Sequence, residues 1–130
     1  MINYRVDTKG IYHIDFINTV TYKDIVHWLA EFSEITPISQ NLYLVYNLCN
    51  ADLKINPRKL VKISHLAEEA TRNYVKVRTA FVMTHGLFKA YVFLFSFLNS
   101  GNKAIRKAFS EQEKAYGWIT SCQSEDLAYG

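Results

Sequence analysis

Two side chains of this sequence have the chemistry of a nucleophile and its base, namely the thiol of Cys49 and the imidazole of His85. A cysteine becomes nucleophilic when a neighbouring base takes its proton. However, no residue that would orient the imidazole and no oxyanion-stabilising motif accompanies the pair. The sequence therefore favours a plainer interpretation, in which Cys49 is a small buried apolar residue and His85 is satisfied by a backbone carbonyl. We predict that the protein is not an enzyme.

The sequence does not predict a metal or another cofactor. The four histidines are far apart, and none has a second histidine or cysteine at the helical i+4 spacing that zinc sites use. His13 and Asp15 share one face of a predicted strand, where a solvent-exposed polar pair accounts for both.

Basic residues gather at the start of one predicted helix: Lys54, Arg58, Lys59 and Lys62. Cations there oppose the helix dipole. They form either an anion or acidic-partner site with the exposed helix amides or a solvated helix face, and the solvated face is favoured. Over the whole chain, 15 basic and 12 acidic residues give a net charge of +3 and are interleaved. Nucleic-acid binding is not predicted, because it requires several convergent cations.

The positions of these candidate residues depend on predicted strands and helices, which alternate along the chain. Apolar runs predict strands at residues 4–7, 11–16, 42–47, 78–83 and 103–109. Capping residues predict helices that begin after Thr21, Asn56 and Ser110, and composition predicts a further helix at 87–98. Strands alternating with helices indicate one α/β domain over residues 1–130. We expect a mixed, mostly parallel sheet of four to five strands, an N-terminal β-hairpin and about four helices.

Ligands of open α/β sheets bind beyond the carboxyl ends of the strands. At that edge the sequence predicts polar loops after the third and fourth strands, with a basic residue where the next helix begins. The residues of this candidate loop site are Asn47, Cys49, Asp52, His85 and Arg58.

The predicted helix at 87–98 is apolar on almost every side. The sheet covers only one side of such a helix, so its other side needs a second subunit, a partner protein, a lipid or a neighbouring helix. If the segment is instead a buried strand, no such partner is needed. We predict a homodimer or protein partner here, or alternatively a groove for a hydrophobic ligand. The candidate surface consists of Leu87, Phe88, Tyr91, Phe95 and Leu98.

The element order and the pattern Ala108-Phe109-Ser110-x-x-Glu113-x-Ala115-x-x-Trp118-Ile119 together resemble the STAS-like domains of anti-sigma-factor antagonists, in particular the SpoIIAA-like branch. The resemblance covers nearly the whole chain. It implies a non-enzymatic, protein-binding or small-ligand-binding role. Phosphoregulated members carry a serine where the helix after the central strand begins. Here residues 47–57 contain no Ser or Thr, and Ser64 lies inside the predicted helix, which argues against a phosphoswitch.

The cellular setting follows from what the sequence lacks. Cys49 and Cys122 are distant and show no CxxC spacing, so both thiols are expected to be reduced. The start of the chain has no apolar signal-peptide core. The apolar stretch at 90–98 is shorter than the ~20 residues of a membrane span. We expect a cytoplasmic regulatory binding module. A carrier of a lipid or acyl chain is the alternative, and an enzyme using Cys49 and His85 is the least favoured hypothesis.

Overall fold

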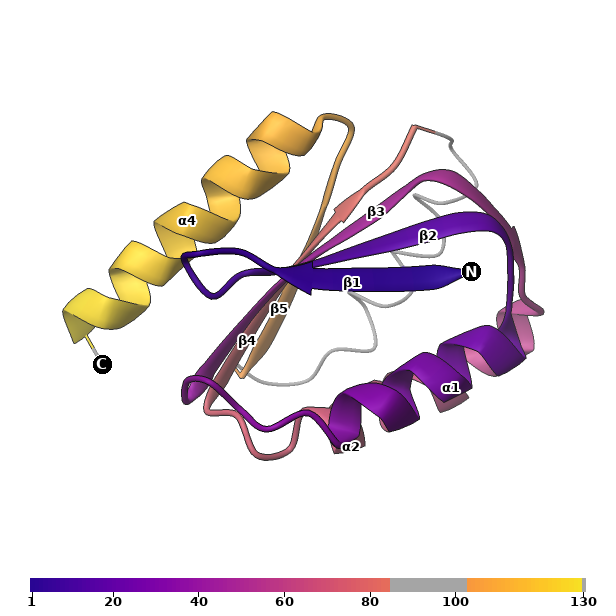
Figure 1. The fold of residues 1–130 in the computed structure, drawn as a ribbon, viewed down its shortest axis with the longest axis horizontal. Helices are drawn as coiled ribbons and strands as arrows, with labels where there is room; N and C mark the ends of the chain where they lie inside the picture. Colours follow the sequence, from indigo (N-terminus) through magenta and orange to yellow (C-terminus); the bar gives the residue numbers. More distant parts are fainter. Residues whose placement is uncertain (85–102, 130) are drawn as a thin grey trace.

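The computed structural model describes residues 1–84 and 103–129, and within them a five-stranded sheet lies between two layers of helices (Figure 1). The strands follow the chain order across the sheet: β1 (Ile2–Val6), β2 (Tyr12–Thr21), β3 (Asn41–Lys54), β4 (Lys76–Val82) and β5 (Ala104–Phe109). β1 is antiparallel to β2, and the other neighbours are parallel. The predicted α/β class, the mostly parallel sheet and the N-terminal hairpin are confirmed.

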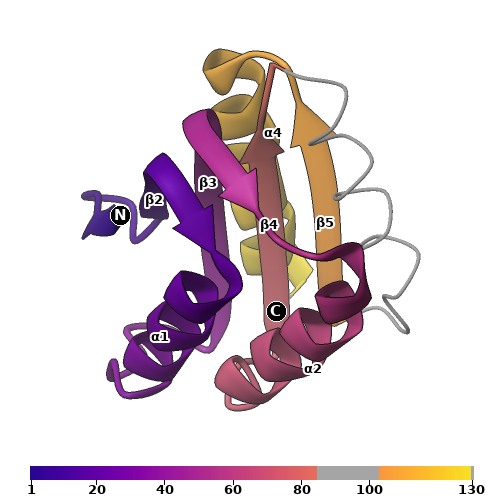
Figure 2. The ribbon, with the colours of Figure 1, turned by 90° about the vertical axis from the view of Figure 1, so that its right-hand side faces the viewer.

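Helices cover both faces of the sheet. α1 (Tyr22–Ser33) and α2 (Leu60–Ala70) lie on one face, and α4 (Gln112–Tyr129) lies on the other (Figures 1 and 2). A short 3-10 helix (Pro57–Lys59) precedes α2. The helix predicted at 87–98 falls outside the described residues.

A tight hairpin joins β1 to β2, as the glycine in its turn predicts. Gly10 has a positive φ of 78°, a conformation that glycine adopts without steric cost. The carboxylate of Asp7 accepts hydrogen bonds from the backbone N–H groups of Lys9 (2.8 Å) and Ile11 (3.1 Å). A side chain at the first position of the turn thus holds the turn together.

The predicted capping box opens α1. The Thr21 hydroxyl accepts a hydrogen bond from the Asp24 backbone N–H (3.3 Å), and the Asp24 carboxylate accepts one from the Thr21 N–H (2.9 Å). Both donors are backbone groups that would otherwise lack a partner at a helix start. The helix then buries one apolar face, as predicted: Ile25, Trp28, Leu29 and Phe32.

The other two helices begin close to the predicted positions. The Asn56 side chain accepts a hydrogen bond from the Arg58 backbone N–H (3.0 Å) and caps the 3-10 helix that leads into α2. α4 begins at Gln112, two residues after Ser110. It buries Ala115 and Ile119, whereas Trp118, which was predicted to be buried, is partly exposed.

The third strand is longer than predicted, and this corrects the candidate loop site. Residues 48–54 continue β3, because Asn50 to Lys54 pair with the second half of β2. The register shifts by one residue opposite Phe16, which is the signature of a β-bulge. The Asn47 side chain accepts a hydrogen bond from the Cys49 N–H (3.0 Å) inside this bulge. Asn47, Cys49 and Asp52 therefore lie in a strand and not in a loop.

Two separate groups of buried side chains pack on the two faces of the sheet. The group facing α1 and α2 includes Tyr12, Ile14 and Phe16 of β2 together with the buried residues of both helices. The group facing α4 includes Ile11, Tyr43, Val45, Ala115 and Ile119. Alternation along β2 and β3 assigns successive side chains to opposite faces, and the first group surrounds the candidate site.

Candidate functional site

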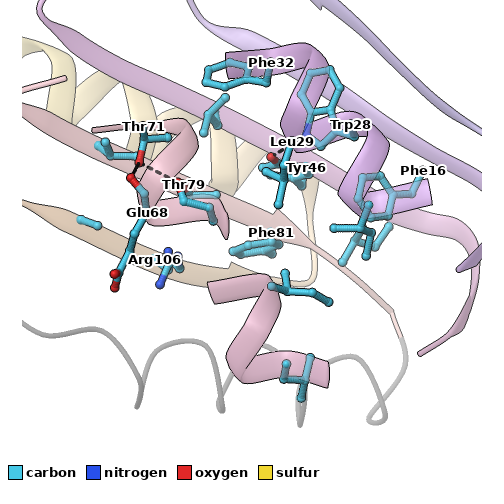
Figure 3. Close-up of a pocket in the computed structure, with 18 of the residues that line it drawn as sticks. Phe16, Trp28, Leu29, Phe32, Tyr46, Glu68, Thr71, Thr79, Phe81 and Arg106 are labelled. Atoms are coloured by element: carbon cyan, nitrogen blue, oxygen red, sulfur yellow. Dashed lines mark hydrogen bonds between the residues drawn. The ribbon is translucent and has the colours of Figure 1, made fainter. Parts of the chain in front are cut away.

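A cavity of about 320 Å³ lies between the sheet and the helices α1 and α2 (Figure 3). Its volume is at the lower end of the range of ~300–1,000 Å³ that is typical of small-ligand sites. The lining is mainly apolar: Phe16, Ile25, Trp28, Leu29, Phe32, Leu44, Tyr46, Leu48, Leu53, Ile55, Leu60, Ile63, Ala67, Val77, Phe81 and Ala104. The polar and charged residues of the described lining are Glu68, Thr71, Thr79, Lys103 and Arg106.

Aromatic rings form one wall of this cavity. Tyr46 of β3 stacks on Phe81 of the neighbouring strand at a centroid distance of 5.3 Å and an interplanar angle of 17°. Phe16 meets the same tyrosine edge-on at 5.6 Å. The indole Nε1–H of Trp28 donates a hydrogen bond to the Tyr46 hydroxyl oxygen at 3.0 Å. A ring wall that is fixed by stacking and by a hydrogen bond is a preformed apolar surface.

The polar groups of the lining come from α2 and from the far strands. Arg106 of β5 pairs in register with Thr79 of β4, and Figure 3 shows Glu68 of α2 between Thr71 and Arg106. Burial lowers the pKa of Arg106, while Tyr46 and Glu68 act in the opposite direction. The Thr71 hydroxyl donates to the Ala67 carbonyl at 2.8 Å, so it closes the end of α2.

A second polar cluster lies on the opposite face of the sheet, beside α4. His13 Nε2 is 2.8 Å from Asp7 Oδ2, and the Tyr116 ring stacks on the imidazole at 5.8 Å. The Tyr116 hydroxyl donates to the same carboxylate oxygen at 3.4 Å. His13 is buried, with 8% of its surface exposed. The expectation of a solvent-exposed pair with Asp15 was therefore wrong, because the turn of the hairpin supplies a nearer carboxylate.

The residues predicted as sites are dispersed where the structure describes them. Cys49 is partly buried against the α4 face, and exposed Asp52 pairs with Lys54 at 3.5 Å. Arg58 is exposed on the 3-10 helix. His85 lies outside the described residues, so the Cys49–His85 pair stays a prediction. The same holds for the predicted partner surface, made of Leu87, Phe88, Tyr91, Phe95 and Leu98.

The basic residues near the start of α2 have partners within the chain in two cases. The Lys54 ammonium pairs with Asp52, and the Lys59 ammonium lies 5.2 Å from the centroid of the Tyr22 ring. Arg58 and Lys62 are exposed. Ser64 is buried inside α2, as the position of this serine in the predicted helix implies.

Three further structural features bear on the function classes considered above. None of the described helices is long and apolar enough to span a membrane. Residues 1–84 and 103–127 contain no cluster of three His, Cys, Asp or Glu side chains that would suit a metal ion. Burial raises the pKa of the Cys122 thiol, and a thiol with a raised pKa is a weaker nucleophile at neutral pH.

The sequence did not identify the cavity. It correctly predicted that Trp28 and Leu29 face inward, but an inward stripe does not show whether side chains meet or surround a hollow. One signal was present in the sequence. Arg106 alternates with Ala104 and Ala108 along the last strand, so this strand places a cation on the face that packs toward the apolar helices. A charged residue at such a position is uncommon without a partner or a function.

Comparisons with known proteins reveal the fold. No family model matches the chain, and no curated protein matches it. An uncharacterised protein of the DUF3478 family with a SpoIIAA-like fold, from Shewanella loihica PV-4, has a TM-score of 0.59 at 11% identity, with 92% of each chain covered. The unphosphorylated anti-sigma factor antagonist SpoIIAA has a TM-score of 0.57 at 13% identity, over 92% of this chain and 98% of that one.

The phosphorylated form of the Bacillus cell fate determinant SpoIIAA gives a TM-score of 0.58 at 10% identity, over 92% of this chain and 99% of that one. Identities this low establish a common architecture and do not transfer an activity. The resemblance seen in the sequence is confirmed at the level of the fold, and the chain adopts a SpoIIAA-like, STAS-like fold.

Proposed function

We propose that this protein is a non-enzymatic binding protein for a small, predominantly apolar ligand such as an acyl chain, held between α1, α2 and the sheet. The cavity of about 320 Å³ is the observation that supports this proposal. Binding sites for small molecules are concave, mostly apolar and furnished with a few polar groups. The cavity combines an aromatic wall with a small polar set, which is the composition expected of such a site.

Burial of the apolar lining also supports a binding role. The cavity is partly open, so its apolar side chains contact water when no ligand is bound. Removing apolar surface from water contributes about 25 cal/mol per Å². A ligand that covers the lining therefore stabilises the native state.

Two experiments test this proposal. First, native purification followed by organic extraction and mass spectrometry is expected to recover apolar material in a fixed stoichiometry. Second, Ala67→Phe places a ring in the cavity lining and is expected to abolish binding of a fluorescent fatty-acid analogue. Ala30→Phe adds the same ring to the exposed side of α1 and serves as the control. Equal binding by both variants, together with no extractable material, would reject the proposal.

A second candidate is a regulatory module that binds a protein partner or a second copy of itself. It is supported by the likeness to an anti-sigma factor antagonist over 92% of the chain. Sedimentation velocity at micromolar concentration distinguishes a dimer from a monomer. Phe95→Asp is expected to dissociate the dimer while the circular dichroism spectrum stays unchanged, and a wild-type monomer would contradict self-association.

A further inference from the structure

The hydrogen bond between Trp28 and Tyr46 has a fixed direction. An indole Nε1–H can only donate, so the Tyr46 oxygen accepts this bond at 3.0 Å. The tyrosine therefore keeps its own hydroxyl proton for another acceptor. Within residues 1–84 and 103–127, the one hydrogen bond shown for the Tyr46 hydroxyl is the bond that it accepts from Trp28. Tyr46 thus presents a hydrogen-bond donor within the lining of an apolar cavity.

A donor in these surroundings calls for an acceptor. Tyr46 is partly exposed and lines an apolar cavity, where a hydroxyl proton without an acceptor is unfavourable. Burial also raises the pKa of Tyr46, so the phenol is neutral and retains its proton at physiological pH. The neighbouring rings of Phe16 and Phe81 offer no acceptor of comparable strength.

The charges of the cavity lining favour an anion over a cation. Lys103 and Arg106 oppose the single acidic residue Glu68 in the described lining, which leaves one net positive charge. A guanidinium carries five N–H donors, so contacts of Arg106 elsewhere do not exhaust it. Arginine also matches the geometry of a carboxylate, with which it can form two parallel hydrogen bonds.

We propose that the ligand is a monocarboxylic acid with an apolar body. Its carboxylate accepts a hydrogen bond from the Tyr46 hydroxyl and lies in the positive potential of Arg106. This inference rests on the proposed function, because it names the chemical class that the same cavity binds. The single net positive charge favours a monoanion over a doubly charged phosphate. The aromatic wall then receives the hydrocarbon part.

Ligands that share one chain and differ in the polar head test the inference. Isothermal titration calorimetry with octanoate, 1-octanol and octylamine on the wild-type protein is expected to show octanoate binding at least about tenfold more tightly than the other two. This comparison needs no variant, so it does not depend on the folding of one.

Variants then test whether Arg106 and Tyr46 cause the preference for octanoate. Arg106→Gln is expected to remove the advantage of octanoate while the affinity for 1-octanol stays the same. Tyr46→Phe retains the ring and is expected to weaken octanoate binding about tenfold. Lys107→Gln, on the exposed side of the same strand, and Tyr22→Phe, outside the cavity lining, are matched controls that should bind as the wild type does.

The outcomes distinguish failure of the carboxylate inference from failure of the proposed function. If wild-type protein binds 1-octanol or octylamine as tightly as octanoate, the carboxylate inference is wrong and the proposed function stands. If none of the three ligands binds and Ala67→Phe behaves as the wild type does, the proposed function fails as well.

Discussion

At the residue scale, a buried charged cluster attaches α4 to the sheet. Asp126 is only 6% exposed. One of its carboxylate oxygens accepts a hydrogen bond from the Tyr43 hydroxyl at 2.8 Å, and the other lies 3.4 Å from the Lys76 ammonium and 3.8 Å from the Arg78 guanidinium. Burial raises the pKa of Tyr43, and Asp126 raises it further. This cluster joins the C-terminal half of α4 to strands β3 and β4.

Removing the carboxylate is expected to be costly, because its partners would remain buried. Asp126→Ala leaves Arg78 without its counter-ion and is expected to lower the free energy of unfolding by about 3–5 kcal/mol. Urea denaturation measures the change. Glu125→Ala removes an exposed neighbouring carboxylate and should change stability by less than about 0.5 kcal/mol. Similar losses in the two variants would contradict a structural role for the buried cluster.

Asp7 gives the fold a contribution to stability that depends on pH. Burial alone would raise the pKa of this carboxyl, but hydrogen bonds from His13 and from the backbone of Ile11 and Lys9 outweigh burial and lower the pKa below 3.8. A carboxyl with a lowered folded-state pKa stabilises the native state above its unfolded-state pKa. That stabilisation is lost as the pH falls through the folded-state value.

Asp7→Asn is therefore expected to be less stable than the wild type at neutral pH, by a margin that shrinks below about pH 4. Urea denaturation of both proteins from about pH 7 to about pH 2 measures this margin. Asp52→Asn, which removes an exposed carboxylate, controls for the change in net charge. A margin that stays constant over the whole range would show that the effect of Asp7 is not electrostatic.

At the element scale, helix starts were predicted well and strand ends were not. Capping residues act locally, so Thr21 and Asp24 were sufficient to locate α1. The end of β3 depends instead on distant pairing. β4 pairs with β3 only as far as Asn47, and beyond that point β2 is the one described strand that pairs with β3. Residues there are polar because they are at an edge, and their polarity resembles that of a loop.

The cap of α1 provides a test of this local control. Thr21→Ala removes the acceptor for the Asp24 backbone N–H and is expected to cost about 1 kcal/mol of unfolding free energy. Thr21→Ser keeps the acceptor and should recover most of this loss. Thr120→Ala makes the same change inside α4 and is expected to be neutral or slightly stabilising, since alanine favours helix interiors. Equal losses for Ala and Ser at position 21 would assign the effect to packing.

At the scale of the whole molecule, the sequence could predict the layers but not the space between them. Apolar faces on α1, α2 and the sheet predict that these elements pack together, and the structure confirms it. Whether the side chains of these layers touch or enclose a cavity depends on the distance between the layers. Many side chains set that distance together. The same Trp28 and Phe81 suit a filled core and a binding wall equally well. Among the described lining residues on the strands, the type of Arg106 does not suit a filled core.

A ligand held between two layers must be released when the layers separate, so binding should stabilise the entire fold. At a free octanoate concentration of 100 times the dissociation constant, linkage predicts about 2.7 kcal/mol of added stability. A thermal melt with increasing octanoate is expected to show Tm rising with the logarithm of concentration in wild-type protein and in Ala30→Phe, and remaining constant in Ala67→Phe. A rise of equal size in all three proteins would place octanoate outside the cavity, because a ring at position 67 changes the lining between α2 and the sheet and leaves the outer surface as it is.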